Sequence, residues 1–300
     1  MVTVMKDKVL VLLAAYNGKQ WIEEQVESIL KQSNVDVRIV ISVDVSTDGT
    51  EELVQSMAAK HPNVEFLPMG KKFGGAARNF YRLIMDADIK DDEYIALSDQ
   101  DDIWKNDKLC RAIANLDKND FYSSNVTAFW ENGMQCEIVK SQPFVDYDYY
   151  FEAAGPGCTY VIKKAAYLEL RKFIIDNQGP VCNIALHDWF IYAFARSRNY
   201  KWYIDNNSGM LYRQHASNQV GANNSLRSIF KRLSLVKNKW YRAEIEKIIE
   251  LFPLSNDRFL HKNIHSGYVG NLKLMFHVCR LRRRSRDRVL LAMALALNFF

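Results

Sequence analysis

Residues 94–104 read Tyr-Ile-Ala-Leu-Ser-Asp-Gln-Asp-Asp-Ile-Trp, an apolar strand candidate that runs directly into three carboxylates. Asp99, Asp101 and Asp102 repel one another and lose solvation at a sheet edge, so their grouping is costly unless a cation lies between them. Carboxylate oxygens suit Mg²⁺ or Mn²⁺, ions that usually also bind substrate phosphates. An alternative is that Asp101 or Asp102 only caps a helix that contains Trp104.

Outward from this stretch, the first 116 residues alternate between strand and helix patterns. Continuous apolar or β-branched runs predict strands at 9–14, 37–44, 64–69 and 94–98. Apolar residues at helical spacing predict helices at 21–32, 50–58, 76–86 and 109–116. This alternation predicts an α/β fold with a mostly parallel, doubly wound sheet, in which ligands bind beyond the carboxyl ends of the strands.

The remaining chain divides into a mixed region and a basic region. Residues 117–225 combine strand candidates at 126–130, 158–162 and 202–204 with helices at 164–173 and 188–195. After Asn223-Asn224-Ser225 the composition becomes basic and helical. We therefore predict one domain over 1–225, with halves 1–116 and 117–225, and a helical extension over 226–300.

Charge is distributed unevenly along the chain. The net charge of +5 is the sum of −6 over residues 1–225 and +11 over residues 226–300. Five scattered cysteines without a CxxC pair argue against a disulfide framework or a zinc site and favour a reducing compartment. No stretch is apolar for long enough to span a membrane, and the first apolar run lacks a signal-peptide cleavage pattern. The sequence thus predicts a cytoplasmic protein.

Four motifs together resemble one known family. They are Ala14-Ala15-Tyr16-Asn17, Asp44-Val45-Ser46-Thr47-Asp48-Gly49-Thr50, Ala77-Arg78-Asn79 and Asp99-Gln100-Asp101-Asp102. Their order and spacing over residues 8–116 are similar to those of family 2 glycosyltransferases with the GT-A fold. The chain departs from the family pattern at Val45, where a glycine is common.

The resemblance implies an inverting, metal-dependent sugar transferase and assigns its donor site. The first half of the domain would bind the nucleotide, with Asp44 on the base and Asp99 on the ribose side. Mn²⁺ or Mg²⁺ would be held on the diphosphate by Asp101 and His215. The other residues implied to bind the nucleotide sugar are Ala15, Tyr16, Asn17, Arg78, Gln100 and Arg213.

Two of these residues also allow ordinary structural interpretations. Arg78 follows the pair Gly74-Gly75, which leaves backbone N–H groups open to a phosphate, but it could equally be a solvated arginine at a helix start. Tyr16 could stack on the base or simply pack at a strand end.

The second half of the domain offers a candidate base and an acceptor site. Asp188, in His187-Asp188-Trp189, could be a helix N-cap, and a carboxylate held there could also accept a proton from an attacking hydroxyl. The resemblance points to Asp188 as the general base, with Trp104 and Trp189 in the acceptor site.

A further segment narrows the resemblance to one subgroup. Tyr212-Arg213-Gln214-His215 could be an ordinary polar loop, but with Asp-Gln-Asp-Asp-x-Trp and His-Asp-Trp it is similar to segments of bacterial rhamnosyltransferases. The implied donor is dTDP-rhamnose, although UDP-hexose enzymes share most of these motifs. The implied role is bacterial cell-surface glycan synthesis.

The basic extension predicts a membrane contact. Six arginines fall within residues 280–288 and are followed by an apolar run to Phe300. The pattern favours peripheral attachment to an anionic membrane through Arg280–Phe300, which suits a lipid-linked glycan acceptor. A helix packed on the domain and a homo-oligomer contact are the alternatives, and no nucleic-acid motif is present.

Two other functions are alternatives to a sugar transferase. A nucleotidyltransferase would be expected to carry a basic, glycine-rich loop near the N-terminus, which residues 14–18 lack. A non-catalytic, membrane-docked scaffold would retain its role without Asp188.

Overall fold

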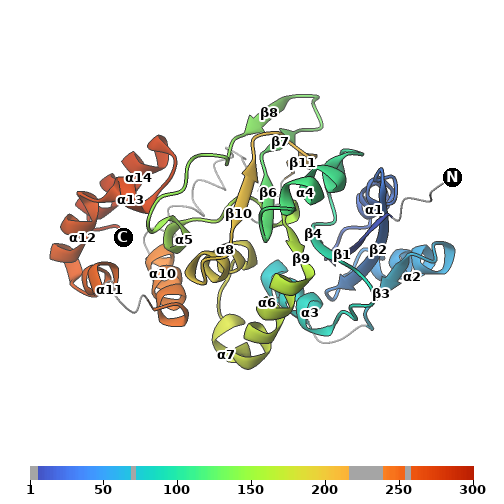
Figure 1. Cartoon of the computed structure of the whole chain (residues 1–300), viewed down its shortest axis with the longest axis horizontal. Helices are drawn as coiled ribbons and strands as arrows, with labels where there is room; N and C mark the ends of the chain where they lie inside the picture. Colours follow the sequence, from blue (N-terminus) through green and yellow to red (C-terminus); the bar gives the residue numbers. More distant parts are fainter. Residues whose placement is uncertain (1–5, 69–71, 216–238, 254–257) are drawn as a thin grey trace.

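The computed structural model describes residues 6–68, 72–215, 239–253 and 258–300. Strands and helices alternate through the first half, as predicted (Figure 1). They are β1 (Asp7–Ala15), α1 (Ile22–Leu30), β2 (Val35–Val43), α2 (Thr50–Lys60), β3 (Val64–Phe66), α3 (Ala76–Asp86) and β4 (Tyr94–Ser98). They are followed by β5 (Ile103–Trp104) and α4 (Lys108–Leu116).

The second half adds strands at the other edge of the sheet and a cluster of helices. Its elements are β6 (Phe121–Ser124), β7 (Val126–Phe129), β8 (Gln135–Ile138), α5 (Asp148–Phe151), the 3-10 turn η1 (Gly157–Thr159), β9 (Val161–Lys163), α6 (Lys164–Asp176), α7 (Gln178–Val181), α8 (His187–Ser197), β10 (Trp202–Asp205) and β11 (Met210–Arg213). The C-terminal helices are α10 (Trp240–Leu251), α11 (Arg258–Ile264), α12 (Gly267–Met275), α13 (Val278–Leu281) and α14 (Ser285–Ala296).

The central sheet has seven strands in the order β10-β6-β9-β4-β1-β2-β3. Only β9 runs antiparallel to its neighbours, β4 and β6. A second sheet orders its strands β5-β11-β7-β8. The mostly parallel α/β sheet predicted from the sequence is confirmed.

The two faces of the central sheet are covered by different helices. Alternate residues of a strand point to opposite faces, so Leu10 and Leu12 pack with α3, α6 and α8, whereas Val9 and Val11 pack with α1, α2 and α4. Because both faces are buried, β1 reads as an unbroken apolar run. The carboxyl ends of β1, β2 and β4 open at one edge.

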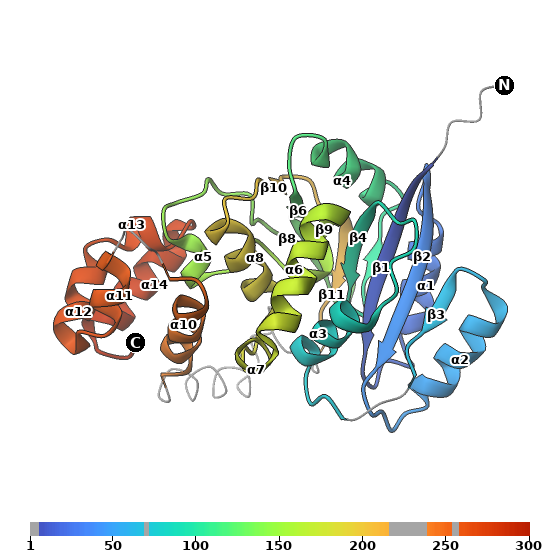
Figure 2. The same cartoon turned by 60° about the horizontal axis from the view of Figure 1, so that its bottom comes forward.

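The C-terminal helices pack on the body of the protein. Side chains of α10, α11, α12 and α14 belong to the same hydrophobic cluster as α3 and α8. These helices lie at the end of the molecule away from β3 and α2 (Figures 1 and 2). The boundary expected at residues 223–225 lies outside the described residues. No helix in the described part of the chain is long and apolar enough to cross a membrane.

The arginines of residues 280–288 differ from the expectation of a solvated cluster. Arg283 is 3% exposed and lies 3.4 Å from both Asp148 and Glu152. Arg280 pairs with Asp146 at 2.7 Å, and Arg282 donates to the Tyr241 hydroxyl at 3.0 Å. Part of the cluster therefore fastens the C-terminal helices to the body, in line with the alternative of a helix packed on the domain. Arg284 and Arg286 are exposed, and Arg280 is exposed while it pairs with Asp146.

Short strands are the elements that the sequence did not predict. β6, β8 and β11 contain four residues each, too few to show a period. Trp104 lies in β5 and not in a helix, and α4 begins at Lys108 after Asp107. Neither Asp101 nor Asp102 is therefore the helix cap that the alternative required.

Candidate functional site

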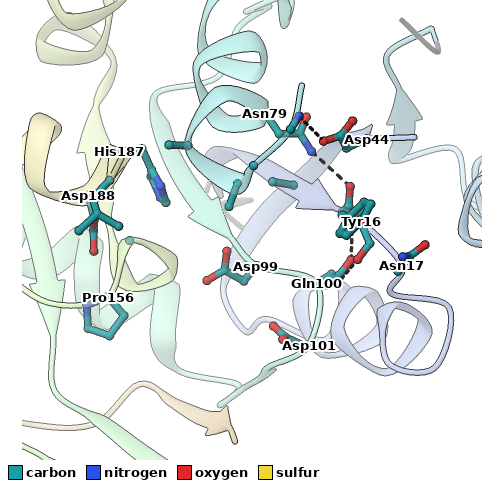
Figure 3. Close-up of a pocket in the computed structure, with 18 of the residues that line it drawn as sticks. Tyr16, Asn17, Asp44, Asn79, Asp99, Gln100, Asp101, Pro156, His187 and Asp188 are labelled. Atoms are coloured by element: carbon teal, nitrogen blue, oxygen red, sulfur yellow. Dashed lines mark hydrogen bonds between the residues drawn. The ribbon is translucent and has the colours of Figure 1, made fainter. Parts of the chain in front are cut away.

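A cavity of about 530 Å³ opens at the carboxyl ends of β1, β2 and β4 (Figure 3). Its walls come from the loops after these strands, the start of α3, residues 156–157 and the start of α8. Residues from both halves of the domain thus meet around one space. Predicted residues on the wall are Ala15, Tyr16, Asn17, Asp44, Asp99, Gln100, Asp101, Asp188 and His215.

Gln100 ties two of these loops together. Its Oε1 accepts from the backbone N–H of Tyr16 at 2.7 Å, and its Nε2 donates to the Tyr16 carbonyl at 2.8 Å. The amide therefore pairs with the backbone as a strand neighbour would. Tyr16 keeps its ring on the cavity wall, half exposed, where it could stack on a flat ligand.

Asp44 is a buried residue of the cavity wall and organises the loop after β2. Its carboxylate accepts N–H bonds from Val45 at 2.8 Å, Phe73 at 2.9 Å and Gly74 at 2.9 Å. Asn17, with φ 46°, accepts from the Thr47 N–H at 2.8 Å. The first two motifs of the sequence thus form one hydrogen-bonded wall.

The acidic end of β4 faces the cavity and meets a histidine. Asp101 Oδ2 lies 2.7 Å from His215 Nε2, although 114 residues separate them. The His215 ring stacks on Trp21 with centroids 4.2 Å apart. Burial, and next the neighbouring Asp101 carboxylate, raises the pKa of Asp99 to about 7. The Asp101 carboxylate and the His215 imidazole, 2.7 Å apart on the cavity wall, are ligand types that Mn²⁺ accepts, whereas the ligand atom of Asp99 lies within 4.8 Å of those of Asp102 and Cys158.

Asp102 turns away from the cavity into the protein. It is 1% exposed, accepts from the Arg213 N–H at 3.1 Å and lies near Cys158. Burial, followed by Asp101 and Asp99, raises its pKa well above the ordinary range. Asp102 therefore anchors β11 beneath the acidic loop and does not add a ligand on the cavity side.

Asp188 approaches from the opposite wall, in the first turn of α8 (Figure 3). The helix is preceded by Leu186, so Asp188 is not its N-cap. Burial raises the pKa of Asp188 to about 6, although the Trp189 N–H, 2.8 Å from Oδ1, opposes the shift. A carboxylate with this pKa is ionised near neutrality and can take up a proton.

Two predicted donor contacts, Arg78 and Arg213, lie outside the cavity lining. Arg78 is exposed and donates to the Cys182 carbonyl at 3.3 Å, outside the cavity lining. Arg213 donates to the Asp101 carbonyl at 2.8 Å and pairs with Glu24, so it braces the acidic loop from behind.

The predicted acceptor contacts Trp104 and Trp189 are corrected. Trp104 is 2% exposed and lies under the Lys108 ammonium, 3.3 Å from its ring centroid. Trp189 is buried, and its Nε1 donates to the Tyr149 carbonyl at 3.0 Å. Both indoles belong to the core because the strand and helix that carry them turn these faces inward.

Sequence reasoning missed several wall residues. His187 is nine-tenths buried, stacks on Phe80 with centroids 4.0 Å apart, and lines the cavity beside Asp188. Burial lowers its pKa to about 3, so the ring is neutral. The sequence indicated Trp21 only as the start of a helix. The missed contacts, His187 with Phe80 and Trp21 with His215, are long-range and leave no local signal.

The chain is similar to known glycosyltransferases, as the geometry of the cavity suggests. The model of "Glycosyl transferase family 2" matches residues 10–173, more than half of the chain. The chain is 50% identical to a dTDP-rhamnosyl transferase, RfbG, of Shigella flexneri, over 96% of this chain and 100% of that protein. It is 26% identical to the UDP-Glc:alpha-D-GlcNAc-diphosphoundecaprenol beta-1,3-glucosyltransferase WfaP of Escherichia coli, over 81% of this chain and 90% of that protein.

A solved structure shares the fold. The mannosyltransferase PcManGT from Pyrobaculum calidifontis, in complex with GDP-Man and Mn²⁺, superposes with a TM-score of 0.52 at 14% identity, over 98% of this chain and 87% of that one. With the family model matched over the cavity-forming strands, the chain belongs to glycosyltransferase family 2 and is a rhamnosyltransferase-like glycosyltransferase.

Proposed function

We propose that this enzyme transfers a rhamnosyl group from dTDP-rhamnose to a lipid-linked or polysaccharide acceptor, with inversion, in bacterial cell-surface glycan synthesis. One observation carries the proposal: the Asp101–His215 pair and the partly protonated Asp188 line one cavity. Asp101 and Asp188 lie on different sides of it (Figure 3). The 50% identity to a dTDP-rhamnosyl transferase over the full length of that protein supports the donor.

The residues on the two walls have separate roles. A divalent ion held by Asp101 and His215 would neutralise the charge that develops on the leaving diphosphate, with Asp99 on the ribose side of the nucleotide. Asp188 accepts the proton of the acceptor hydroxyl as that oxygen attacks the anomeric carbon. One displacement without a covalent intermediate inverts the anomeric centre.

The donor is tested by a panel of nucleotide sugars with and without Mn²⁺. dTDP-rhamnose with Mn²⁺ should raise the Tm most, and transfer should require both. If a UDP-hexose stabilises the protein more than dTDP-rhamnose, the alternative donor class is correct. If no nucleotide sugar shifts the Tm in a metal-dependent way, a non-catalytic scaffold becomes the better interpretation.

The pH dependence of transfer should identify Asp188 as the general base. Because the pKa of Asp188 is raised to about 6 and its ionised form is active, kcat should rise tenfold per pH unit below pH 6 and level off above it. The measurement is kcat at saturating donor and metal between pH 4.5 and pH 8. A flat profile through pH 6 would contradict this assignment.

Gly157 should tolerate no side chain. A Cβ there would lie 2.3 Å from His187 Nε2, so Gly157→Ala forces the imidazole or the 156–159 segment to move beside Asp188. We expect kcat/KM to fall at least tenfold and the free energy of unfolding to fall by about 1–3 kcal/mol. Gly179→Ala, with nothing within 4 Å of the added carbon, is the control that should be neutral. Equal effects of the two substitutions would refute a steric cause.

We also propose that the enzyme works at the inner face of the cell membrane, attached through Arg280–Phe300. Four large apolar side chains of α14 and its end lie exposed at helical spacing, at positions 289, 290, 293 and 297. Arg286 precedes them on the same stripe. Such a stripe suits an interfacial helix. The relative from Escherichia coli, whose named acceptor is a diphosphoundecaprenol lipid, supports a lipid-linked acceptor.

A further inference from the structure

A second cavity, of about 330 Å³, lies among the C-terminal helices, away from the sugar site. Phe259, Lys262 and Asn263 of α11 form one side, and Lys273 of α12 and His277 form the other. Nothing in the proposed transfer reaction uses these residues.

The cavity is cationic. In the described part of the chain, neither Lys262 nor Lys273 has a carboxylate within 4.0 Å. His277 Nδ1 donates to the Lys273 carbonyl at 2.8 Å, which fixes the imidazole ring beside Lys273. Asn263 is 4% exposed, and its Nδ2 donates to the Phe259 carbonyl at 2.8 Å. The ammonium groups of Lys262 and Lys273 border one cavity, and neither has a carboxylate within 4.0 Å in the described part of the chain. They therefore favour the binding of an anion with several oxygens.

Two large apolar side chains are exposed along the segment that contributes Lys273 and His277 to this cavity. Phe276, between the cavity residues Lys273 and His277, is 80% exposed. Val269 lies in α12, seven residues before Phe276 at the end of that helix, and is 61% exposed. The Tyr268 hydroxyl donates to the Ala296 carbonyl at 2.9 Å, so α12 is joined to the end of the exposed stripe of α14. An exposed apolar surface of this kind marks an interaction site.

We propose that this cavity binds the phosphate of an anionic membrane lipid while Phe276 and Val269 enter the interface between headgroups and acyl chains. The inference rests on the proposed membrane-bound acceptor and deepens it. Charge complementarity selects the occupant: a symmetric contact between two copies would bring two cationic cavities together, whereas an anionic bilayer matches both the ammonium groups and the apolar rim. Arg280, Arg282 and Arg283 bind residues of the body and contribute less to this contact.

Vesicle co-sedimentation of the full chain tests the site. We expect binding to phosphatidylcholine vesicles that contain about one-third phosphatidylglycerol, and little binding to phosphatidylcholine alone. Lys262→Glu with Lys273→Glu should weaken binding to the vesicles that contain phosphatidylglycerol by at least about 30-fold, because each lysine near an anionic surface contributes about 1 kcal/mol. Lys60→Glu with Lys118→Glu, which makes the same charge change at exposed lysines outside the C-terminal helices, should leave it within about twofold. Phe276→Ser should weaken binding without changing its dependence on charge.

Each other outcome has a definite meaning. Unchanged vesicle binding by the double variant, or equal binding to neutral vesicles, overturns the proposal. Binding of inorganic phosphate that depends on both lysines, without vesicle binding, would assign the cavity to a free phosphate and overturn it as well. A concentration-dependent dimer that the Phe276→Ser variant abolishes would show a second copy as the occupant.

The same variants separate this proposal from the transfer reaction. The Tm shift with donor and Mn²⁺ reports the sugar site and should persist in the double variant, which also verifies its folding. If the donor shift is absent from the wild type while vesicle binding still depends on Lys262 and Lys273, the proposed function fails and the lipid site stands. Lys262→Gln with Lys273→Gln repeats the test without added negative charge.

Discussion

Asp188→Asn is expected to reduce kcat by about 10³-fold while leaving donor binding intact. The substitution keeps the size of the side chain and an oxygen for the Trp189 N–H, but the amide cannot accept a proton from the acceptor. Single-turnover transfer measures the loss, and the Tm shift with donor and Mn²⁺ measures binding. The residual rate should no longer change through pH 6.

The same variant should be more stable than the wild type near neutral pH. Burial raises the pKa of Asp188 from 3.8 to about 6 in the folded enzyme, so the folded state holds the ionised carboxylate at a cost. The cost is complete above pH 6, is at most about 3 kcal/mol, and disappears as the pH falls toward 4. Urea unfolding should therefore show Asp188→Asn stabilised at pH 8 and level with the wild type near pH 4.

Two comparisons show whether the lost activity comes from the missing base. Asp176→Asn changes a carboxylate at the end of α6, outside the cavity lining, and should alter neither activity nor its pH profile. If Asp188→Asn loses the donor-dependent Tm shift together with turnover, the residue acts in donor binding and not as the base.

The sequence predicted the parts of the site that lie close together along the chain. Asp99, Gln100 and Asp101 follow an apolar strand, and strand ends in a parallel sheet meet at one edge, so their position in the cavity was predictable. The positions of residues whose role depends on side-chain orientation were not predictable. Trp104 and Trp189 adjoin site motifs, yet their rings pack in the core.

Contacts between distant segments account for most of the remaining differences. His215 was implied only by the family resemblance, and nothing local shows that it reaches Asp101 or stacks on Trp21. The arginines after residue 279 look like a solvated cluster in sequence, but Asp146, Asp148 and Glu152 lie more than 120 residues earlier and pair with two of them. Periodicity describes one element at a time and carries no information on such pairs.

Asp101→Asn is the second substitution with a large expected effect. Asp101 Oδ2 is 2.7 Å from His215 Nε2 on the cavity wall, and the carboxylate is the anionic member of the pair. Without it, the proposed ion would be held more weakly and the charge on the leaving diphosphate would be less well neutralised. We expect kcat/KM to fall by about 10³-fold and the Mn²⁺-dependent part of the donor Tm shift to disappear, whereas His215→Ala, which keeps the carboxylate, should cost less.

The comparison between two neighbouring carboxylates makes this prediction specific. Asp107 precedes α4, six residues after Asp101, and is outside the cavity lining, so Asp107→Asn removes the same charge from the same segment. Full activity and a full Mn²⁺ response in Asp107→Asn, set against their loss in Asp101→Asn, would assign the effect to the cavity and not to the net charge of the loop. Retention of the Mn²⁺-dependent shift in Asp101→Asn would show that the ion is held without this residue. Asp99, whose pKa is raised to about 7 by burial and by Asp101, would then be the ligand to substitute next.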